Sequence, residues 1–147
     1  MPAMRPVYLL SLLTALTFSC SVEDRIERRE DRLLGAWQID KATFKDDGDL
    51  FSSNVTNEFR GDRVTFFPDY TLLYEAGNGQ LFDGYWVISA VRDLDDETEF
   101  TLDADFFDLR GRPSFQWLGT IRRLSGNRLN VTVFERGGVL QLRWDKL

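Results

Sequence analysis

The sequence has no histidine and only one cysteine, Cys20, among its 147 residues. The lack of histidine excludes a Ser-His-Asp triad, a Cys-His pair and any histidine-ligated zinc or haem site. A single cysteine excludes an intrachain disulfide, a cysteine-cluster zinc site and a cysteine-ligated iron–sulfur cluster. The net charge of −6 comes without a basic cluster, which argues against a nucleic-acid partner. No cofactor is expected, and what remains is a small acidic protein that is 43% apolar and 14% aromatic.

The main apolar run lies near the N-terminus and is too short to span a membrane as a helix. Residues 7–18 include nine apolar residues among 12. This length matches the apolar core of a signal peptide, whereas a spanning helix needs about 20 residues. The run closes on Ser19 and Cys20, a small residue followed by the single cysteine. This order resembles the cleavage box of bacterial lipoproteins, in which the cysteine becomes the acylated N-terminus.

We therefore expect residues 1–19 to be a cleaved signal peptide and Cys20 to carry a lipid. An ordinary cleaved signal with an incidental cysteine is the alternative. Each buried CH₂ of an acyl chain contributes about 0.8 kcal/mol to membrane binding, so several chains anchor a protein stably. The acidic pair Glu23-Asp24 resembles the export signal of surface lipoproteins in Bacteroidetes. The expected location is the cell envelope, lipid-anchored to the outer membrane and either periplasmic or surface-exposed.

Residues 20–32 form a strongly charged segment after the expected cleavage site. Nine of residues 21–32 are charged, and such a composition cannot bury enough apolar surface to offset its ordering entropy. We expect a solvated tether between the lipid and the folded domain. The alternative is a short helix that plugs one end of the fold, because Val22, Ile26 and Leu33 recur at helical spacing.

From Leu33 to Leu147 the apolar residues follow a period of two. Turn residues separate the alternating segments, and Gly77-Asn78-Gly79 is a strong hairpin signal because these residues accept positive φ at low cost. The expected strands are 33–44, 63–67, 70–75, 81–89, 97–103, 114–124, 128–135 and 139–146, with 51–56 and 106–109 as further candidates. Sequential hairpins with one apolar face favour an all-β, eight- to nine-stranded antiparallel up-and-down barrel over residues 33–147, with a sandwich as the alternative.

Gly35-Ala36-Trp37 opens the first expected strand and resembles the Gly-x-Trp signature of the lipocalins. In that family the tryptophan closes the floor of the barrel. The resemblance implies the same role for Trp37, with Arg143 as the arginine that packs over it.

Three further segments, 67–71, 84–88 and 127–131, look like those of short lipocalin-like lipoproteins of Bacteroidetes. Those proteins usually have glycine where this chain has Tyr70. The resemblance implies a lipocalin-like domain over residues 33–147 that follows a lipid anchor.

Large side chains fall on the expected inward faces of the strands. As candidate interior or ligand-contacting residues we take Trp37, Phe66, Tyr70, Trp86, Phe100, Trp117 and Trp144. Aromatic side chains commonly fill small barrels, so core packing is the first interpretation and ligand contact the second. Since a barrel of about eight strands is just wide enough to be filled or to hold one small molecule, we expect a cavity that is small, shallow and apolar, or absent.

No metal site and no catalytic residue are expected. The acidic loops 46–49 and 93–97 lack the spacing of a calcium loop, and no serine after residue 19 lies in a Gly-x-Ser-x-Gly setting. The expected function is that of a lipid-anchored, non-catalytic binding module for a small apolar ligand. The alternative is an envelope lipoprotein with a filled barrel that binds another protein. An open apolar cavity favours the first function, and a filled interior with an exposed aromatic patch favours the second.

Overall fold

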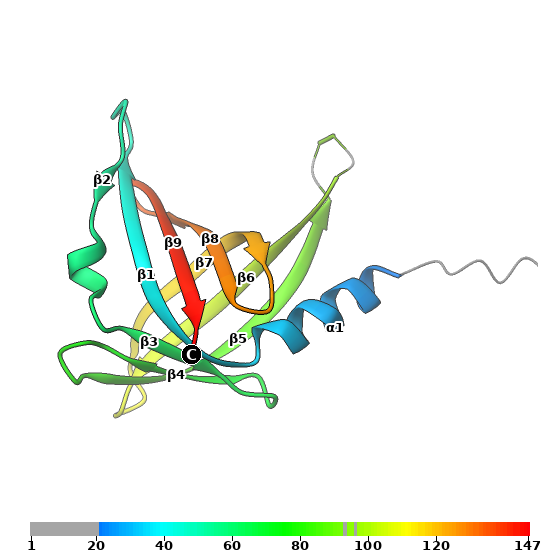
Figure 1. Ribbon diagram of the computed structural model, residues 1–147, viewed down its shortest axis with the longest axis horizontal. Coiled ribbons are helices and arrows are strands. Elements are labelled where there is room, and N and C mark those ends of the chain that lie inside the picture. Colours follow the sequence, from blue (N-terminus) through cyan, green and yellow to red (C-terminus); the bar gives the residue numbers. More distant parts are fainter. Residues whose placement is uncertain (1–20, 93, 96) are drawn as a thin grey trace, which may run out of the picture.

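The computed structural model describes residues 21–92, 94, 95 and 97–147 (Figure 1). The predictions for the signal peptide and for Cys20 concern residues outside this described part. The described elements in chain order are α1 (Val22–Leu33), β1 (Gly35–Asp46), β2 (Ser53–Asn54), the 3₁₀-helix η1 (Thr56–Phe59), β3 (Arg63–Phe66), β4 (Thr71–Glu75), β5 (Leu81–Arg92), β6 (Thr98–Asp108), β7 (Pro113–Leu124), β8 (Arg128–Glu135) and β9 (Gly138–Lys146).

Eight of these strands form a closed antiparallel barrel. Strands β3 to β9 pair in chain order, and β1 closes the ring by pairing with β9 on one side and β3 on the other. The β1–β9 ladder runs from Trp37 opposite Lys146 to Asp46 opposite Gly138. The short β2 adds a few residues to the far end of β1. The predicted all-β up-and-down barrel is confirmed, and the closing ladder excludes the sandwich.

Two of the expected strands differ in detail from the structure. Residues 97–103 and 106–109 belong to one continuous strand, because β6 pairs with β5 along its whole length. The candidate strand 51–56 holds only β2 and the start of η1. That segment has no alternating apolar face, and the side chain of Phe51 is largely exposed.

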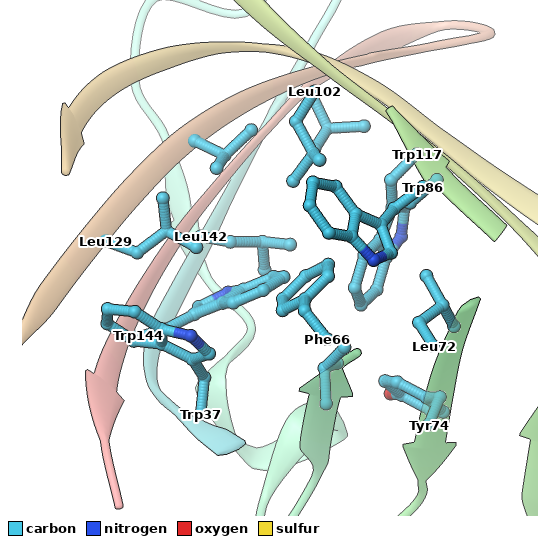
Figure 2. Packing of buried hydrophobic residues seen from close by; sticks show 14 of the residues in the cluster. Trp37, Phe66, Leu72, Tyr74, Trp86, Leu102, Trp117, Leu129, Leu142 and Trp144 are labelled. Atoms are coloured by element: carbon cyan, nitrogen blue, oxygen red, sulfur yellow. The ribbon is translucent and has the colours of Figure 1, made fainter. Parts of the chain in front are cut away.

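Large side chains from the inner faces of the strands fill the barrel. Along β5, buried residues alternate with exposed ones from Phe82 to Ile88, which is the pattern of a strand with one wet face. The bulkiest fully buried side chains are Trp37, Trp144, Phe66, Phe106, Leu33, Leu102, Leu129 and Leu142. The ring of Phe66 stacks on Trp144 at 6.0 Å and meets Trp86 edge-on at 5.8 Å, and Figure 2 shows these rings meeting inside the barrel. The interior is a packed core and not a deep cup.

Backbone groups in the middle of β1 form hydrogen bonds with the segment that leads into β3. The Ile39 amide donates to the Asp62 carbonyl at 3.1 Å. The Ala42 amide donates to the Thr56 hydroxyl at 3.0 Å, and the Ala42 carbonyl accepts from the Val55 amide at 3.0 Å. These bonds satisfy backbone groups that an open sheet edge would expose. The wall of the barrel is therefore continued here by a turn and a 3₁₀-helix.

The charged segment 22–33 forms helix α1, so the prediction of a solvated tether is wrong and the helical alternative is correct. Ser21 and Asp24 form a capping box, in which each side chain accepts a hydrogen bond from the backbone amide of the other residue. At the other end of the helix, Leu33 is fully buried, and Ile26 packs against the core from the middle. A few apolar side chains at helical spacing are thus enough to bind a strongly charged helix to the barrel.

Two arginines of α1 add to this packing. The guanidinium carbon of Arg29 lies 3.5 Å from the ring centroid of Phe100, and that of Arg25 lies 5.0 Å from it. A guanidinium over an aromatic face is attracted by the ring, while its aliphatic stem covers apolar surface. Burial and the neighbouring arginines lower the pKa of Arg29. Figure 1 shows α1 leaving the barrel near the C-terminus, beside β5.

Trp37 joins α1 to the floor of the barrel. Its Nε1 donates to the Leu33 carbonyl at 2.7 Å, at the C-terminal end of the helix. The indole is fully buried, and the Nζ of Lys146 lies 5.0 Å from its ring centroid. Arg143 was expected over this ring but pairs with Asp40 at the surface. That expectation is wrong, because alternation along β9 turns Lys146, and not Arg143, toward the ring.

The two fully buried indoles should respond differently to replacement by phenylalanine. Trp37→Phe leaves the Leu33 carbonyl without its donor, whereas Nε1 of Trp144 has no hydrogen-bond partner within the described residues. A buried polar group left unsatisfied costs about 1–3 kcal/mol, so we expect Trp37→Phe to reduce the free energy of unfolding by roughly 1–2 kcal/mol more than Trp144→Phe. Urea melts of the full chain measure this difference. Equal losses would mean that the Trp37 hydrogen bond does not stabilise the floor.

Candidate functional site

The barrel has one covered end and one open end. Helix α1 covers the end where β1 begins and β9 finishes, through contacts with β5 and β7. At the opposite end, a hollow of about 570 Å³ opens between η1, the β4–β5 hairpin, the first residues of β7 and the end of β8. We call this hollow the mouth. Its volume lies within the range of small-molecule sites, roughly 300–1,000 Å³.

Aromatic rings form the floor of the mouth. Tyr74, Phe82, Phe115 and Trp117 line it, and Phe106 packs beneath them. Phe115 stacks on Phe106 at 4.3 Å and meets Phe82 edge-on at 5.3 Å. Tyr74 meets Trp117 edge-on at 5.5 Å. These are preferred aromatic geometries, so the floor is an apolar surface built from side chains that hold one another in place.

A buried carboxylate lies in the wall of the mouth. Asp62 is only 5% exposed; its Oδ1 accepts from the Gly77 amide at 2.7 Å, and its Oδ2 accepts from the Tyr74 hydroxyl. Among the ion pairs of the described residues, none involves Asp62. Burial and the hydrogen bond to Asp62 raise the pKa of Tyr74 well above its usual value. The phenol therefore remains a donor and keeps the carboxylate in place.

Two glycines bring Asp62 to this position. A Cβ at Gly77 would lie 1.9 Å from the Arg60 carbonyl oxygen, so only glycine lets the β4–β5 hairpin approach this turn. Gly61 has a φ of +86°, a conformation that favours glycine and reverses the chain before β3. The turn at 77–79 was predicted from the sequence. The carboxylate was not, because a single acid in a polar turn carries no pattern that marks it as buried.

Most of the residues singled out from the sequence lie in the core and not at the mouth. The structure buries Trp37, Phe66, Trp86, Phe100, Trp117 and Trp144. Of these, only Trp117 also lines the mouth. Trp86 donates its Nε1 to the Phe67 carbonyl at 3.2 Å, and Phe100 lies beneath α1. Ligand contact by Trp117 stays a prediction.

The sequence indicated the inward faces of the mouth residues but not the mouth itself. Alternation placed Phe82 and Phe115 on inward faces, together with Trp86 and Trp117 respectively. It does not say which inward residues lie at an open end, because that depends on where each hairpin ends. The signal for the open end was position in the sequence. Phe82 follows the 77–79 turn closely, and Phe115 follows the turn before β7.

Tyr70 lies outside the interior, so the prediction for this residue is wrong. It occupies the turn between β3 and β4 with a φ of 64°, and it is 48% exposed. Its hydroxyl donates to Glu30 Oε2 of α1 at 3.3 Å, and its ring packs on Trp86 at 5.2 Å. A positive φ is a conformation that glycine adopts more readily than tyrosine. In this chain the contacts of Tyr70 connect the turn to the helix.

A second hollow, of about 750 Å³, lies outside the barrel against β4, β5 and β6. Tyr85 and Phe107 meet edge-on at 6.1 Å across these strands. Tyr85, Phe67 and Leu109 are all substantially exposed. We call the surface formed by these four residues the outer aromatic face. Contiguous exposed apolar residues of this kind commonly mark an interaction surface.

Neither a metal site nor a membrane-spanning helix is found in the described part of the chain. Within residues 21–92, 94, 95 and 97–147, no group of three or more His, Cys, Asp or Glu side chains is placed to hold a metal ion. In the same residues, no helix has both the length and the apolar character needed to cross a membrane. Comparisons with protein-family models, curated proteins and solved structures found no match.

Tyr74 should make the stability of the barrel fall at high pH. The raised pKa keeps the folded phenol protonated, whereas the phenol of the unfolded chain ionises above about pH 10. The stabilising difference is complete below that pH and is lost as the pH rises beyond it. We expect the free energy of unfolding to fall with pH more steeply in the wild type than in Tyr74→Phe, by up to about 1.4 kcal/mol per pH unit.

Urea melts between about pH 8 and pH 11 measure both slopes, and the remaining tyrosines cancel in the comparison because both proteins contain them. Parallel curves for the two proteins would contradict the assignment of Tyr74 as a protonated donor.

Proposed function

We propose that this protein is a non-catalytic binding module that holds a small, largely apolar molecule in the mouth. The observation that carries the proposal is the hollow of about 570 Å³ whose floor is made of Tyr74, Phe82, Phe115 and Trp117. Apolar walls with a few polar groups are typical of small-molecule sites. Because packed side chains fill the interior below these rings, the ligand sits at the end of the barrel and not deep inside it.

The proposed module is anchored to the envelope by a lipid on Cys20, at the outer membrane and facing either the periplasm or the exterior. The apolar run 7–18 and the Ser19-Cys20 junction support this. Ser21, the N-cap of α1, directly follows Cys20. Since α1 covers the end of the barrel opposite the mouth, an anchor at the start of this helix leaves the mouth accessible.

The second candidate function is the binding of another protein through the outer aromatic face. Its support is the exposure of Tyr85 and Leu109 beside the partly buried Phe107, together with a filled barrel interior. Aromatic side chains are enriched in protein interfaces. The mouth ranks first because interlocking aromatic rings form its floor and a buried carboxylate, Asp62, lies in its wall.

Binding at the mouth can be tested with N-phenyl-1-naphthylamine, a neutral apolar molecule that fluoresces when it leaves water. We expect the purified full chain to enhance its fluorescence saturably. Phe115→Leu removes a ring from the mouth and should weaken binding about fivefold, in line with the value of a lost aromatic contact. The matched control Phe107→Leu removes a partly buried ring from the outer aromatic face and should leave the affinity unchanged.

The absence of saturable enhancement would refute the proposed function. A loss of affinity in Phe107→Leu and not in Phe115→Leu would instead move the binding site to the outer aromatic face.

Lipidation can be tested independently of ligand binding. When the full chain is expressed with its native N-terminus, the wild type should incorporate labelled palmitate, and Cys20→Ala should not, because only the thiol of Cys20 can accept the lipid. Gel fluorography or scintillation counting measures the label. Equal labelling of the two proteins, or a mature N-terminus other than Cys20, would contradict the anchor.

A further inference from the structure

The carboxylate of Asp62, in the wall of the mouth, still has acceptor capacity. An ionised carboxylate offers about four lone-pair positions, and the hydrogen bonds from Gly77 and Tyr74 use one on each oxygen. Asp62 is 5% exposed, is one of the residues that line the hollow, and forms none of the ion pairs of the described residues. A buried charge without a counter-charge is costly. A cation that enters the mouth therefore gains an electrostatic interaction with a carboxylate that water solvates poorly.

The charges around the rim of the mouth also favour the binding of a cation. Glu58 and Glu135 line the hollow together with Asp62, and the single cationic side chain of the lining is that of Arg60. The guanidinium of Arg60 is directed to a neutral acceptor, since its Nη2 donates to Asn57 Oδ1 at 2.8 Å. The lining therefore carries a net negative charge above an aromatic floor, and both features attract cations, the rings through their negative faces.

We propose that the mouth takes a small aromatic molecule that carries a primary ammonium group, with the ammonium on the Asp62 carboxylate and the aromatic group on the rings of Phe82 and Phe115. This inference rests on the proposed function and adds the chemical class of the ligand. The aromatic group replaces water on an apolar floor, and the ammonium neutralises the buried carboxylate. One ligand thereby covers the apolar floor and supplies a counter-charge to the buried carboxylate.

The hydrogen bonds already present favour an ammonium over a guanidinium. A guanidinium binds a carboxylate best in a bidentate fork that needs a free position on both oxygens in one plane. At Asp62, Oδ1 already accepts from Gly77 and Oδ2 from Tyr74, so a fork has to align with the one position left on each oxygen. An ammonium is a compact point charge with rotatable donors, so it can use a single remaining lone pair without displacing either bond.

A charge series on one aromatic frame tests the inference. The probes are 2-(1-naphthyl)ethylamine, which is a cation at pH 7, the neutral 2-(1-naphthyl)ethanol and the anionic 1-naphthylacetate, each titrated into the purified full chain by calorimetry. Because one charge-assisted hydrogen bond is gained, we expect the ammonium compound to bind about tenfold more tightly than the alcohol. The carboxylate should bind most weakly.

Two variants locate the effect. Asp62→Asn removes the charge and nearly preserves the shape, so it should bring the ammonium compound close to the affinity of the alcohol. Glu135→Gln removes a rim charge and is the matched control, in which most of the advantage of the ammonium should persist. If Asp62→Asn does not fold, ¹³C NMR of the wild type decides, because the Asp62 Cγ resonance should shift with the ammonium compound and not with the alcohol.

The outcomes distinguish failure of the ammonium proposal from failure of the proposed function. If the ammonium and the alcohol bind equally well, the ammonium proposal is wrong while the mouth remains an apolar site. An advantage that survives in Asp62→Asn, or an Asp62 resonance that does not respond, also overturns it. If none of the three probes binds, the proposed function fails together with the inference.

Discussion

The ladder between β1 and β9 is the constraint on which the rest of this structure depends. It joins the first strand to the last and places Ile39 opposite Trp144 and Trp37 opposite Lys146. In an open sheet, β1 and β9 would be two edges with unpaired backbone groups, and their tryptophans would lie at opposite margins. Closure removes these edges and turns the inner faces of all the strands toward one axis, so that two indoles from the ends of the chain share a single core.

The closed barrel has two ends, and they are built differently. At the floor, α1 supplies Leu33 and accepts the indole N–H of Trp37 on its last turn. At the mouth, a turn and a 3₁₀-helix continue the wall, and Asp62 binds the β4–β5 hairpin through Gly77. Since the volume between the two ends is filled by side chains, the floor serves stability, and the mouth is a concave surface at the open end.

Charge composition and apolar alternation gave wrong predictions for two parts of the chain, residues 21–32 and Tyr70. The charges of residues 21–32 indicated a solvated tether, yet the guanidinium groups of Arg25 and Arg29 lie over the ring of Phe100. Leu33 joins the core, and Ile26 packs against it. Tyr70 follows the apolar alternation of its neighbours, yet a positive φ turns it out of the barrel. For the helix the deciding contact is with Phe100 of β6, far away in the chain, and for Tyr70 it is the backbone conformation of the turn; composition and alternation report neither.

The sequence alone determined the period-two alternation, the hairpin turns and an antiparallel all-β fold rich in inward-facing tryptophans, for which a barrel was favoured over a sandwich. These follow from local rules, because side-chain direction along a strand and the conformational freedom of glycine are set within a few residues. Only the tertiary structure decided that the core is full, that α1 covers the floor, and that Asp62 is buried beside Tyr74 at the mouth. Those features depend on strand register and on the close approach of Gly77 to Arg60, which are contacts between segments that no local pattern encodes.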